Sequence, residues 1–318
     1  MRAAVVHSFS HAPQYTEFAE PEPVGEHQEL VTVLAAGLHP RVRSQADGSH
    51  YTATSELPLV PGIDGVGRRA DGSLVYFVIP DTISGSFAER TVIDRRLSVP
   101  LPADVDPVLV AAAMNPALSS WVALHQRVTF TPGQSVLILG ATGSAGSLAI
   151  RTARRLGAST IIAAGRGADR LEGLLALGAS GTIDLAKDPD TVAAEIAAKA
   201  ANVDVVLDYL WGPPTEKAIM PLLLARTDRS KALAWIAIGS SAGDSITLPS
   251  AALRQANVRF LGSGQGSVST AGILAVLPGL VAELAAGTFP IDVVARPLAE
   301  VEAAWTEPAG GPRVVFVP

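Results

Sequence analysis

The stretch SVLILGATGSAGSLAIRTARRLGAS, residues 135–159, has the pattern of a buried strand, a glycine-rich turn and an amphipathic helix. Its turn places Gly140, Gly143 and Gly146 where a chain leaves a strand, brings its backbone close to a ligand and packs a helix tightly on a sheet. The helix that follows directs free N–H groups and the positive end of its dipole toward the turn. The alternative is an ordinary tight turn, but a second strand at the correct distance favours a phosphate-binding turn.

Apolar runs separated by helical patterns continue from this turn toward the C-terminus. Most of these runs are apolar throughout, which is typical of strands that are covered on both faces of a sheet. Strands that alternate with helices indicate parallel pairing with helical crossovers. We therefore expect residues 123–263 to form a Rossmann domain, a doubly wound sheet of six parallel strands. The six runs lie at 135–140, 160–165, 181–185, 203–208, 232–239 and 258–263.

The flanks of this region have a different pattern. Residues 1–122 contain short β-like segments broken by Pro- and Gly-rich turns, so a mainly β domain is expected there. Residues 264–318 contain two helical segments and a closing strand, which are too few to fold alone, and we expect them to return to the N-terminal domain. The predicted fold is thus α/β, with the six-stranded domain inserted into a mainly β domain.

The charge and the composition argue against several classes of function. The chain of 318 residues has a net charge of −6, which disfavours binding to nucleic acid or to anionic lipid. It has no cysteine, so disulfides, thiolate nucleophiles and cysteine-bound zinc are ruled out. No uninterrupted apolar run approaches the roughly 20 residues of a membrane span, and the first residues lack a signal-peptide pattern. We expect a cytoplasmic protein with no nucleic-acid or membrane partner.

The end of the second strand indicates which dinucleotide the turn would hold. An NAD site usually has Asp or Glu there, to bond the ribose 2′-hydroxyl, whereas this chain has Gly165 and Arg166. A guanidinium matches a 2′-phosphate in charge and in geometry, although an arginine in a solvated loop would give the same sequence. Arg170 either assists or lies on a helix surface. We expect NADPH, with its pyrophosphate at Gly140, Ala141, Thr142, Gly143, Ser144, Ala145 and Gly146.

Several segments in a fixed order resemble the medium-chain dehydrogenase/reductase superfamily, in its zinc-independent quinone-reductase-like and enoyl-reductase-like branch. They include VLAAGLHPRVRSQADGSHY at 33–51, PLVPGIDGVGR at 58–68, AAAMNPALSSWVAL at 111–124 and VDVVLDYLWG at 203–212. The resemblance covers nearly the whole chain. It implies a GroES-like β domain, an inserted Rossmann domain and an active site in the cleft between them. It also implies a homodimer formed along the edge of the cofactor sheet, near 258–263.

The resemblance also bears on metal binding. Zinc-dependent members of the superfamily hold a catalytic zinc with three side chains, and the matching positions here are His39, Ile63 and Asn115. A catalytic zinc needs about three protein ligands, and an isoleucine side chain has no lone pair, so no metal site is expected. Asp64 matches an acidic residue beside that metal site, and we expect it to serve in a turn or in a hydrogen bond.

Candidate catalytic residues follow from the resemblance as well. Some enoyl-reductase-like relatives have a catalytic tyrosine in the loop that holds Tyr51 here, and a phenol that is protonated at neutral pH can donate a proton. The alternatives are a tyrosine that packs at the loop edge, or His50 or His39 as the donor. Asn115 and Ser119 match a segment that approaches the nicotinamide, unless they cap a helix. At the ends of the later strands, the expected nicotinamide contacts are Asp208, Gly239, Ser240 and Ser263.

These expectations define an NADPH-dependent, metal-free oxidoreductase that reduces a small electrophile, either an activated C=C bond or a quinone. Hydride would pass from the cofactor to the substrate, with Tyr51 or water as the source of the proton. Two alternatives stay open: a zinc-free NADPH-dependent reductase of a C=O or C=N bond, and a protein that binds NADPH without turnover. Arg41 and Arg43 replace neutral or acidic residues of relatives, and they either attract an acidic substrate or are solvated.

Overall fold

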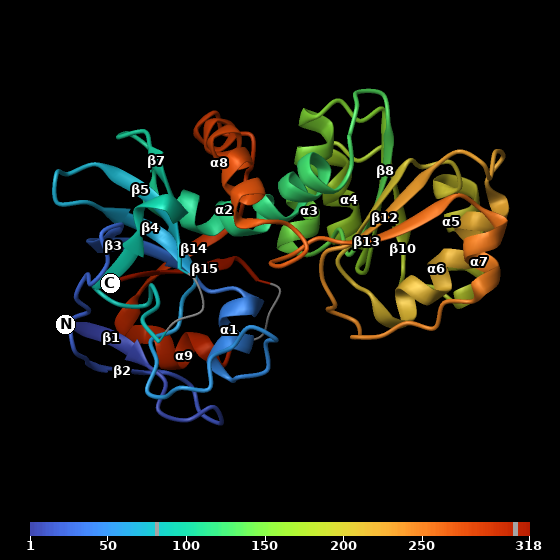
Figure 1. Cartoon of the computed structure of the whole chain (residues 1–318). Coiled ribbons are helices and arrows are strands. Elements are labelled where there is room, and N and C mark those ends of the chain that lie inside the picture. Colours follow the sequence, from blue (N-terminus) through green and yellow to red (C-terminus); the bar gives the residue numbers. More distant parts are fainter. Residues whose placement is uncertain (80–82, 308–310) are drawn as a thin grey trace. The chain divides into compact units, whose positions relative to one another are not determined.

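The computed structural model contains a mixed β sheet and a parallel β sheet (Figure 1). The residues that the structure describes are 1–79, 83–307 and 311–318. Each of the two sheets belongs to its own compact unit, so the units are described one after the other.

One of the two units is formed by two separate segments of the chain, and the other is continuous. The first consists of Met1–Asn115 and Val281–Pro318, and the second is the continuous segment Pro116–Leu280. Two helices, α2 (Pro107–Val122) and α8 (Thr270–Ala285), run across the divisions between them. The domain limits at 122 and 263 that the sequence suggests stay predictions.

The sheet of the first unit joins strands from distant parts of the sequence. Among the described residues its order is β14-β15-β3-β4-β5-β7, with β6 also paired to β3, while β1 and β2 form a separate two-stranded sheet. β15 is antiparallel to β3, with Phe316 opposite Ala36, so the last strand completes a sheet built mainly from the first 101 residues. The bounds are β1 (Arg2–Val5), β2 (Gln14–Glu17), β3 (Gln28–Gly37), β4 (Asp64–Arg68), β5 (Leu74–Val78), β6 (Arg90–Asp94), β7 (Ser98–Leu101), β14 (Val293–Pro297) and β15 (Arg313–Val317).

Aromatic residues from both segments fill the core of the first unit. Phe77, Phe87 and Phe316 are completely buried. The rings of Phe87 and Phe316 meet edge to face with their centroids 5.1 Å apart, a geometry that aromatic pairs favour. Burial of side chains this large provides much of the stability that holds the two segments of the unit together.

One of the two arginines of the α1 helix has a structural role. α1 (Pro40–Ala46) begins at a proline, which suits the first helical position, and it carries Arg43 in its last turn. Arg43 donates hydrogen bonds to the carbonyl oxygens of Ala304 and Trp305 at the end of α9 (Val301–Trp305), and its guanidinium stacks over the Trp305 ring. A cation at a helix C-terminus is stabilising, so Arg43 joins two helices of the first unit.

The sheet of the second unit has the strand order of a Rossmann fold. All six strands are parallel, in the order β10-β9-β8-β11-β12-β13, so the third, second and first strands are followed by the fourth, fifth and sixth. Between β8 and β11 the direction of winding reverses, and ligands of such sheets bind at that point, outside the carboxyl ends of the strands. The bounds are β8 (Ser135–Leu139), β9 (Thr160–Gly165), β10 (Gly181–Asp184), β11 (Val205–Asp208), β12 (Leu233–Ala237) and β13 (Val258–Gly262).

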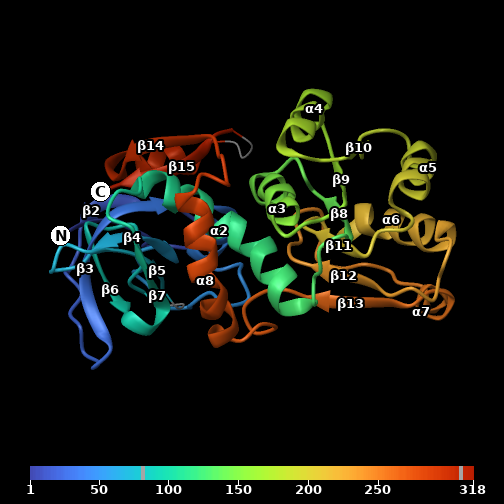
Figure 2. The same ribbon diagram turned by 90° about the horizontal axis from the view of Figure 1, so that it is seen from above.

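Helices cover both faces of this sheet (Figure 2). Val136 and Ile138 of β8 pack with residues of α3 (Ser144–Arg155) and α4 (Ala168–Leu177). The alternate residues of the same strand, Leu137 and Leu139, pack on the other face. Both faces are therefore apolar, as the sequence predicts. The helices of the second face are α5 (Pro189–Ala200), α6 (Gly212–Ala225) and α7 (Ser250–Gln255).

In the described part of the chain, one helical segment has the length and mean hydropathy of a membrane span. It is Pro107–Arg127. An 18-residue window of this segment has a mean hydropathy of 1.4, and 67% of that window is buried inside the protein. Core helices of folded proteins have the same length and composition, so this segment is weak evidence for a membrane span.

Candidate functional site

The glycine turn after β8 has the conformation that close packing requires. Gly140 has a φ of +88°, which favours glycine, and a Cβ on it would lie 3.0 Å from Leu210 Cδ2. A Cβ on Gly146 would lie 2.3 Å from the carbonyl oxygen of Gly140 and 2.7 Å from Ala141 Cα. The start of α3 thus rests directly on the turn, and a side chain at Gly146 would force them apart.

The N-terminus of α3 is suited to an anion. Gly143 is the N-cap residue, is exposed and has no side chain to occupy the end of the helix. The first turn, which begins at Ser144, contains no acidic residue. Its N–H groups have no acceptor within the helix and carry the positive end of the dipole. A phosphate group of a ligand would satisfy these donors.

The end of β9 lies beside the same turn. A Cβ on Gly165 would lie 2.6 Å from Thr142 Cγ2, so the strand end and the turn are in close contact. The N–H of Arg166 donates to Thr142 Oγ1 at 3.4 Å, and the Arg166 residue itself is exposed. The structure therefore brings the predicted arginine next to the predicted phosphate turn, while Arg170 lies exposed in the first turns of α4.

Asp208, a predicted nicotinamide contact, is completely buried at the end of β11. Its Oδ1 accepts hydrogen bonds from the N–H groups of Leu210 at 2.9 Å and Trp211 at 3.0 Å. Its Oδ2 accepts from Thr215 Oγ1 at 2.7 Å and Trp235 Nε1 at 2.9 Å. With four protein donors on one carboxylate, Asp208 fixes the turn in which Trp211 has a φ of +53°, a rare conformation for a bulky residue.

Ser119 forms hydrogen bonds inside the second unit. Its hydroxyl donates to the carbonyl oxygen of Pro116 at 2.7 Å, and it lies 3.1 Å from the hydroxyl of Tyr209. Ser119 stands within α2 and so does not cap it. Tyr209 is not among the residues predicted from the sequence, although its position directly after an apolar strand is a signal that could indicate it.

The other predicted residues of the second unit lie at the carboxyl ends of β12 and β13. The N–H of Gly239 donates to the carbonyl oxygen of Asp208, and the N–H of Ser263 donates to that of Ala237. Ser240 is exposed. Their contacts with a cofactor stay predictions, as do those of the residues at the glycine turn.

The catalytic candidates of the first unit differ in exposure. The Tyr51 residue is 75% exposed, and its ring stacks on that of His50 with the centroids 4.4 Å apart. Asn115 is partly buried in α2. The roles assigned to both residues stay predictions.

His39 and Asp64 form a buried polar cluster with Tyr76. His39 Nε2 lies 3.0 Å from Asp64 Oδ1, and the Tyr76 hydroxyl donates to Asp64 Oδ2 at 2.7 Å. Burial lowers the pKa of His39 below 6.5 despite the nearby Asp64. Burial, together with the Asp64 charge, raises the pKa of Tyr76 well above 10. The cluster thus contains a neutral imidazole, and Asp64 makes the hydrogen bonds that the sequence predicts.

These residues do not fit a zinc site. The side chain of Ile63 lacks a lone pair, and both carboxylate oxygens of Asp64 accept hydrogen bonds from protein groups. Within residues 1–79, 83–307 and 311–318, no three His, Cys, Asp or Glu side chains are grouped as a metal site.

The buried His39 leads to a prediction about pH and stability. Its pKa is lower in the folded than in the unfolded protein, so below pH 6.5 the unfolded chain binds more protons and the free energy of unfolding falls. A lowering of the His39 pKa by one unit corresponds to about 1.4 kcal/mol in the free energy of unfolding. We expect the melting temperature of the wild type to fall more between pH 7.5 and 5.5 than that of His39→Gln. A His7→Gln control at an exposed histidine should retain the full decrease, and equal decreases in all three proteins would contradict the prediction.

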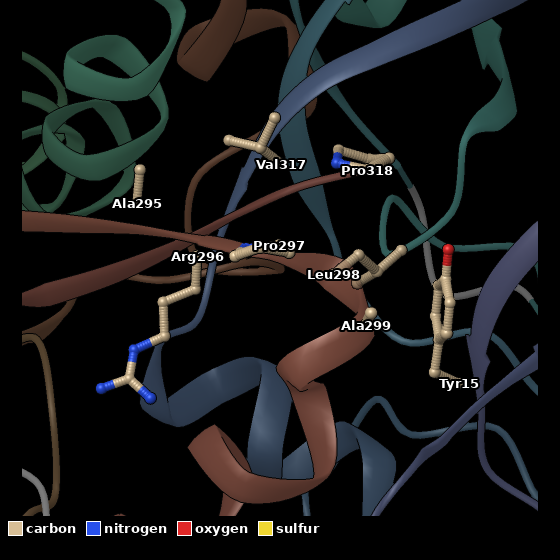
Figure 3. Close-up of a pocket in the computed structure, with 8 residues that line it drawn as sticks. All are labelled: Tyr15, Ala295, Arg296, Pro297, Leu298, Ala299, Val317 and Pro318. Atoms are coloured by element: carbon tan, nitrogen blue, oxygen red, sulfur yellow. The ribbon is translucent and has the colours of Figure 1, made fainter.

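A hollow of about 400 Å³ lies elsewhere in the first unit (Figure 3). Its charged side chain, Arg296, points away from Tyr15 and makes hydrogen bonds to Glu307 at 2.6 and 3.0 Å. The predicted site residues do not line it. The lining residues are Tyr15, Ala295, Arg296, Pro297, Leu298, Ala299, Val317 and Pro318.

A Rossmann sheet with an unobstructed helix N-terminus and an adjacent arginine defines a dinucleotide-binding protein. No protein-family model matches the chain. The chain is 34% identical, over an alignment of 361 residues that covers 100% of both proteins, to the "Probable NADPH-dependent quinone reductase tdiC" of Emericella nidulans. It therefore belongs to the quinone oxidoreductase-like branch of the medium-chain dehydrogenase/reductase superfamily, and the predicted family is confirmed.

Two further comparisons agree with this assignment. The chain is 29% identical over 181 residues to the "NADPH-dependent alkenal/one oxidoreductase, chloroplastic" of Arabidopsis thaliana. This alignment covers 52% of the chain and 47% of that protein. The solved quinone oxidoreductase of Thermus thermophilus, described together with its NADPH complex, matches with a TM-score of 0.82 and 26% identity over 100% of both chains. The predicted α/β fold class, a GroES-like domain plus a Rossmann domain, is thereby confirmed.

Proposed function

We propose that this protein is an NADPH-dependent oxidoreductase that reduces a quinone or an activated C=C bond of a small electrophilic molecule. The observation that carries the proposal is the position of Arg166, which follows β9 and is linked through Thr142 to the open N-terminus of α3. The full-length similarity to a quinone reductase and the partial similarity to an alkenal/one oxidoreductase support the class of substrate.

The residues of the chain have separate tasks in this proposal. The first-turn N–H groups of α3 bind the pyrophosphate, and Arg166 binds the 2′-phosphate. When bound, NADPH supplies the hydride. Tyr51 holds a proton on its Oη and gives it to the oxyanion or carbanion of the reduced substrate, while Asn115 and Ser119 orient the reactants.

The proposal includes reduction without zinc. Two observations support reduction without zinc: His39 is hydrogen-bonded to Asp64, and the side chain of Ile63 is apolar. Activity that persists after dialysis against a chelator, in protein that contains less than stoichiometric zinc by elemental analysis, is the expected result. Activity that disappears and returns with added zinc would contradict it.

We also propose a cytoplasmic homodimer that forms along β13. This edge strand is paired with β12 alone among the described strands, so its second row of backbone groups faces outward. Sedimentation equilibrium is expected to give twice the mass of the chain, and a monomer at all concentrations would contradict the proposal.

The proposed reaction can be tested by the products as well as by the rate. NADPH consumption is followed with a panel of quinones, enones, ketones and imines. An enone should give the saturated ketone, whereas an allylic alcohol would show C=O reduction. If NADPH raises the melting temperature but no substrate consumes it, the protein binds the cofactor without turnover.

Replacing Tyr51 with phenylalanine should separate proton transfer from cofactor binding. Loss of a general acid lowers rates by about 10²-fold or more, so kcat should fall strongly while the Kd for NADPH stays within about twofold. Tyr15→Phe, a change of the same type in the first unit, should leave both values unchanged. An unaltered kcat in Tyr51→Phe would remove this residue from the mechanism.

A further inference from the structure

Tyr209 lies at the point of the second unit where the winding of the sheet reverses. It follows β11 directly, and its Cβ is 3.2 Å from the position that a Cβ on Gly140 would take. Its carbonyl oxygen accepts hydrogen bonds from the N–H of Ser241 at 3.3 Å and from Ser241 Oγ at 2.9 Å. The backbone of Tyr209 is therefore fixed between the glycine turn and the loop after β12.

The direction of the hydrogen bonds at the Tyr209 hydroxyl follows from proton counting. A carbonyl oxygen can only accept, so the single proton of Ser119 Oγ is used at Pro116 O, 2.7 Å away. The proton between Ser119 Oγ and Tyr209 Oη, which are 3.1 Å apart, must then come from the tyrosine. Ser120 also forms a side-chain hydrogen bond with Tyr209, and its own proton is used at Thr152 Oγ1, 2.9 Å away. Both serines therefore accept, and Tyr209 Oη keeps its lone pairs with the O–H held toward the two serines.

The phenol remains neutral at all ordinary pH values. The ring of Tyr209 packs against the apolar cluster that includes Ala141 and Leu207, and burial raises the pKa of Tyr209 to about 12. Its oxygen is thus a neutral, oriented acceptor rather than a phenolate, and it suits a donor such as an amide N–H.

The order of the strands indicates which part of a dinucleotide would meet this acceptor. Arg166 follows β9, the glycine turn follows β8 and Tyr209 follows β11, and these three strands are neighbours in that order. If Arg166 binds the adenosine ribose phosphate and the turn binds the pyrophosphate, the nicotinamide half extends toward β11. Its carboxamide carries two N–H donors.

On the basis of the proposed NADPH binding, we propose that Tyr209 orients the nicotinamide by accepting a hydrogen bond from its carboxamide N–H at Oη. Ser119 is a positioning residue in this arrangement, because it holds the phenolic proton away from the cofactor. Tyr209 would thus select a nicotinamide that carries a carboxamide over one that does not.

The test compares NADPH with its reduced 3-acetylpyridine analogue, in which a methyl ketone without N–H replaces the carboxamide. Dissociation constants are measured by cofactor fluorescence for the wild type and for Tyr209→Phe. The wild type should prefer NADPH by about tenfold, and the variant should lose most of that preference while its melting temperature stays within a few degrees. A purely structural role would weaken both ligands equally.

Two other variants sharpen the result. Ser119→Ala leaves the Tyr209 ring in place but removes one of the two serines that hold its O–H, so the preference for NADPH should fall in part. Tyr15→Phe, at a residue that lines the hollow of the first unit, should keep the full preference (Figure 3). These variants test the acceptor even if Tyr209→Phe folds poorly.

The outcomes separate this inference from the proposed function. If NADPH binds and is consumed but Tyr209→Phe discriminates as the wild type does, the role of Tyr209 is overturned and the proposed function stands. A wild type that binds NADPH and the analogue equally well also overturns that role alone. If the wild type binds neither ligand, both the proposed function and the role of Tyr209 fail.

Discussion

Arg166→Ala is expected to weaken NADPH binding by roughly 10-fold to 100-fold, because it removes charge-assisted hydrogen bonds to a 2′-phosphate. NADH has a hydroxyl at that position, so its affinity should change by less than about twofold. The strand end that carries Arg166 is fixed by close contact between Gly165 and Thr142 and not by the arginine side chain. Stability should therefore be unaffected by the substitution.

Isothermal titration with both dinucleotides measures the difference. Arg170→Ala is the matched control, since Arg170 is also exposed and lies only four residues further along the chain. Replacing Arg170 should lower the affinity for NADPH much less than replacing Arg166. Equal losses for NADPH and NADH in Arg166→Ala would show that the arginine does not contact a 2′-phosphate.

Gly146→Ala should destabilise the protein by about 3 kcal/mol or more, although it adds a single methyl group. The new Cβ would lie 2.3 Å from the carbonyl oxygen of Gly140 and 2.7 Å from Ala141 Cα. Both are backbone atoms of the turn, so they cannot rotate away as a side chain can. The start of α3 must move, and NADPH binding should be lost together with stability.

Gly143→Ala provides the matched control for this prediction. A Cβ there would lie 3.5 Å from Gly140 O, an ordinary contact, and the residue has a φ of −85°. Stability should fall by at most about 1 kcal/mol, whereas NADPH affinity should still drop because the methyl group takes space beside the phosphates. Urea unfolding and titration separate the two effects. If Gly146→Ala is as stable as Gly143→Ala, the packing argument is wrong.

The parallel sheet could be predicted from sequence because its determinants are local. Val136, Leu137, Ile138 and Leu139 are all apolar, and the structure buries alternate members of this run on opposite faces. The mixed sheet is harder to predict, since its strands are short and their partners are distant. Nothing in the local sequence near Ala36 indicates that Phe316 will lie opposite it.

The candidate site shows the same division between local and distant signals. Two signals can be recognised within a window of about 30 residues: the spacing of the glycines, and the arginine that follows the second strand. Asp208 is predicted to lie near the nicotinamide half, whereas the hydrogen bond that it accepts from Trp235, a residue of the next strand, is evident only in the folded chain. The link between Ser119 and Tyr209 joins residues 90 positions apart, so only the folded chain reveals it.

The pairing of β15 with β3 has a consequence for biosynthesis. Arg313–Val317 are translated after every residue of the Rossmann unit. The N-terminal sheet therefore lacks one neighbour of β3 until these residues have been synthesised. The Rossmann unit, being continuous in sequence, can fold first. Nascent chains stalled before codon 313 should thus expose the β3 edge to proteases and chaperones while the dinucleotide-binding half is already protected.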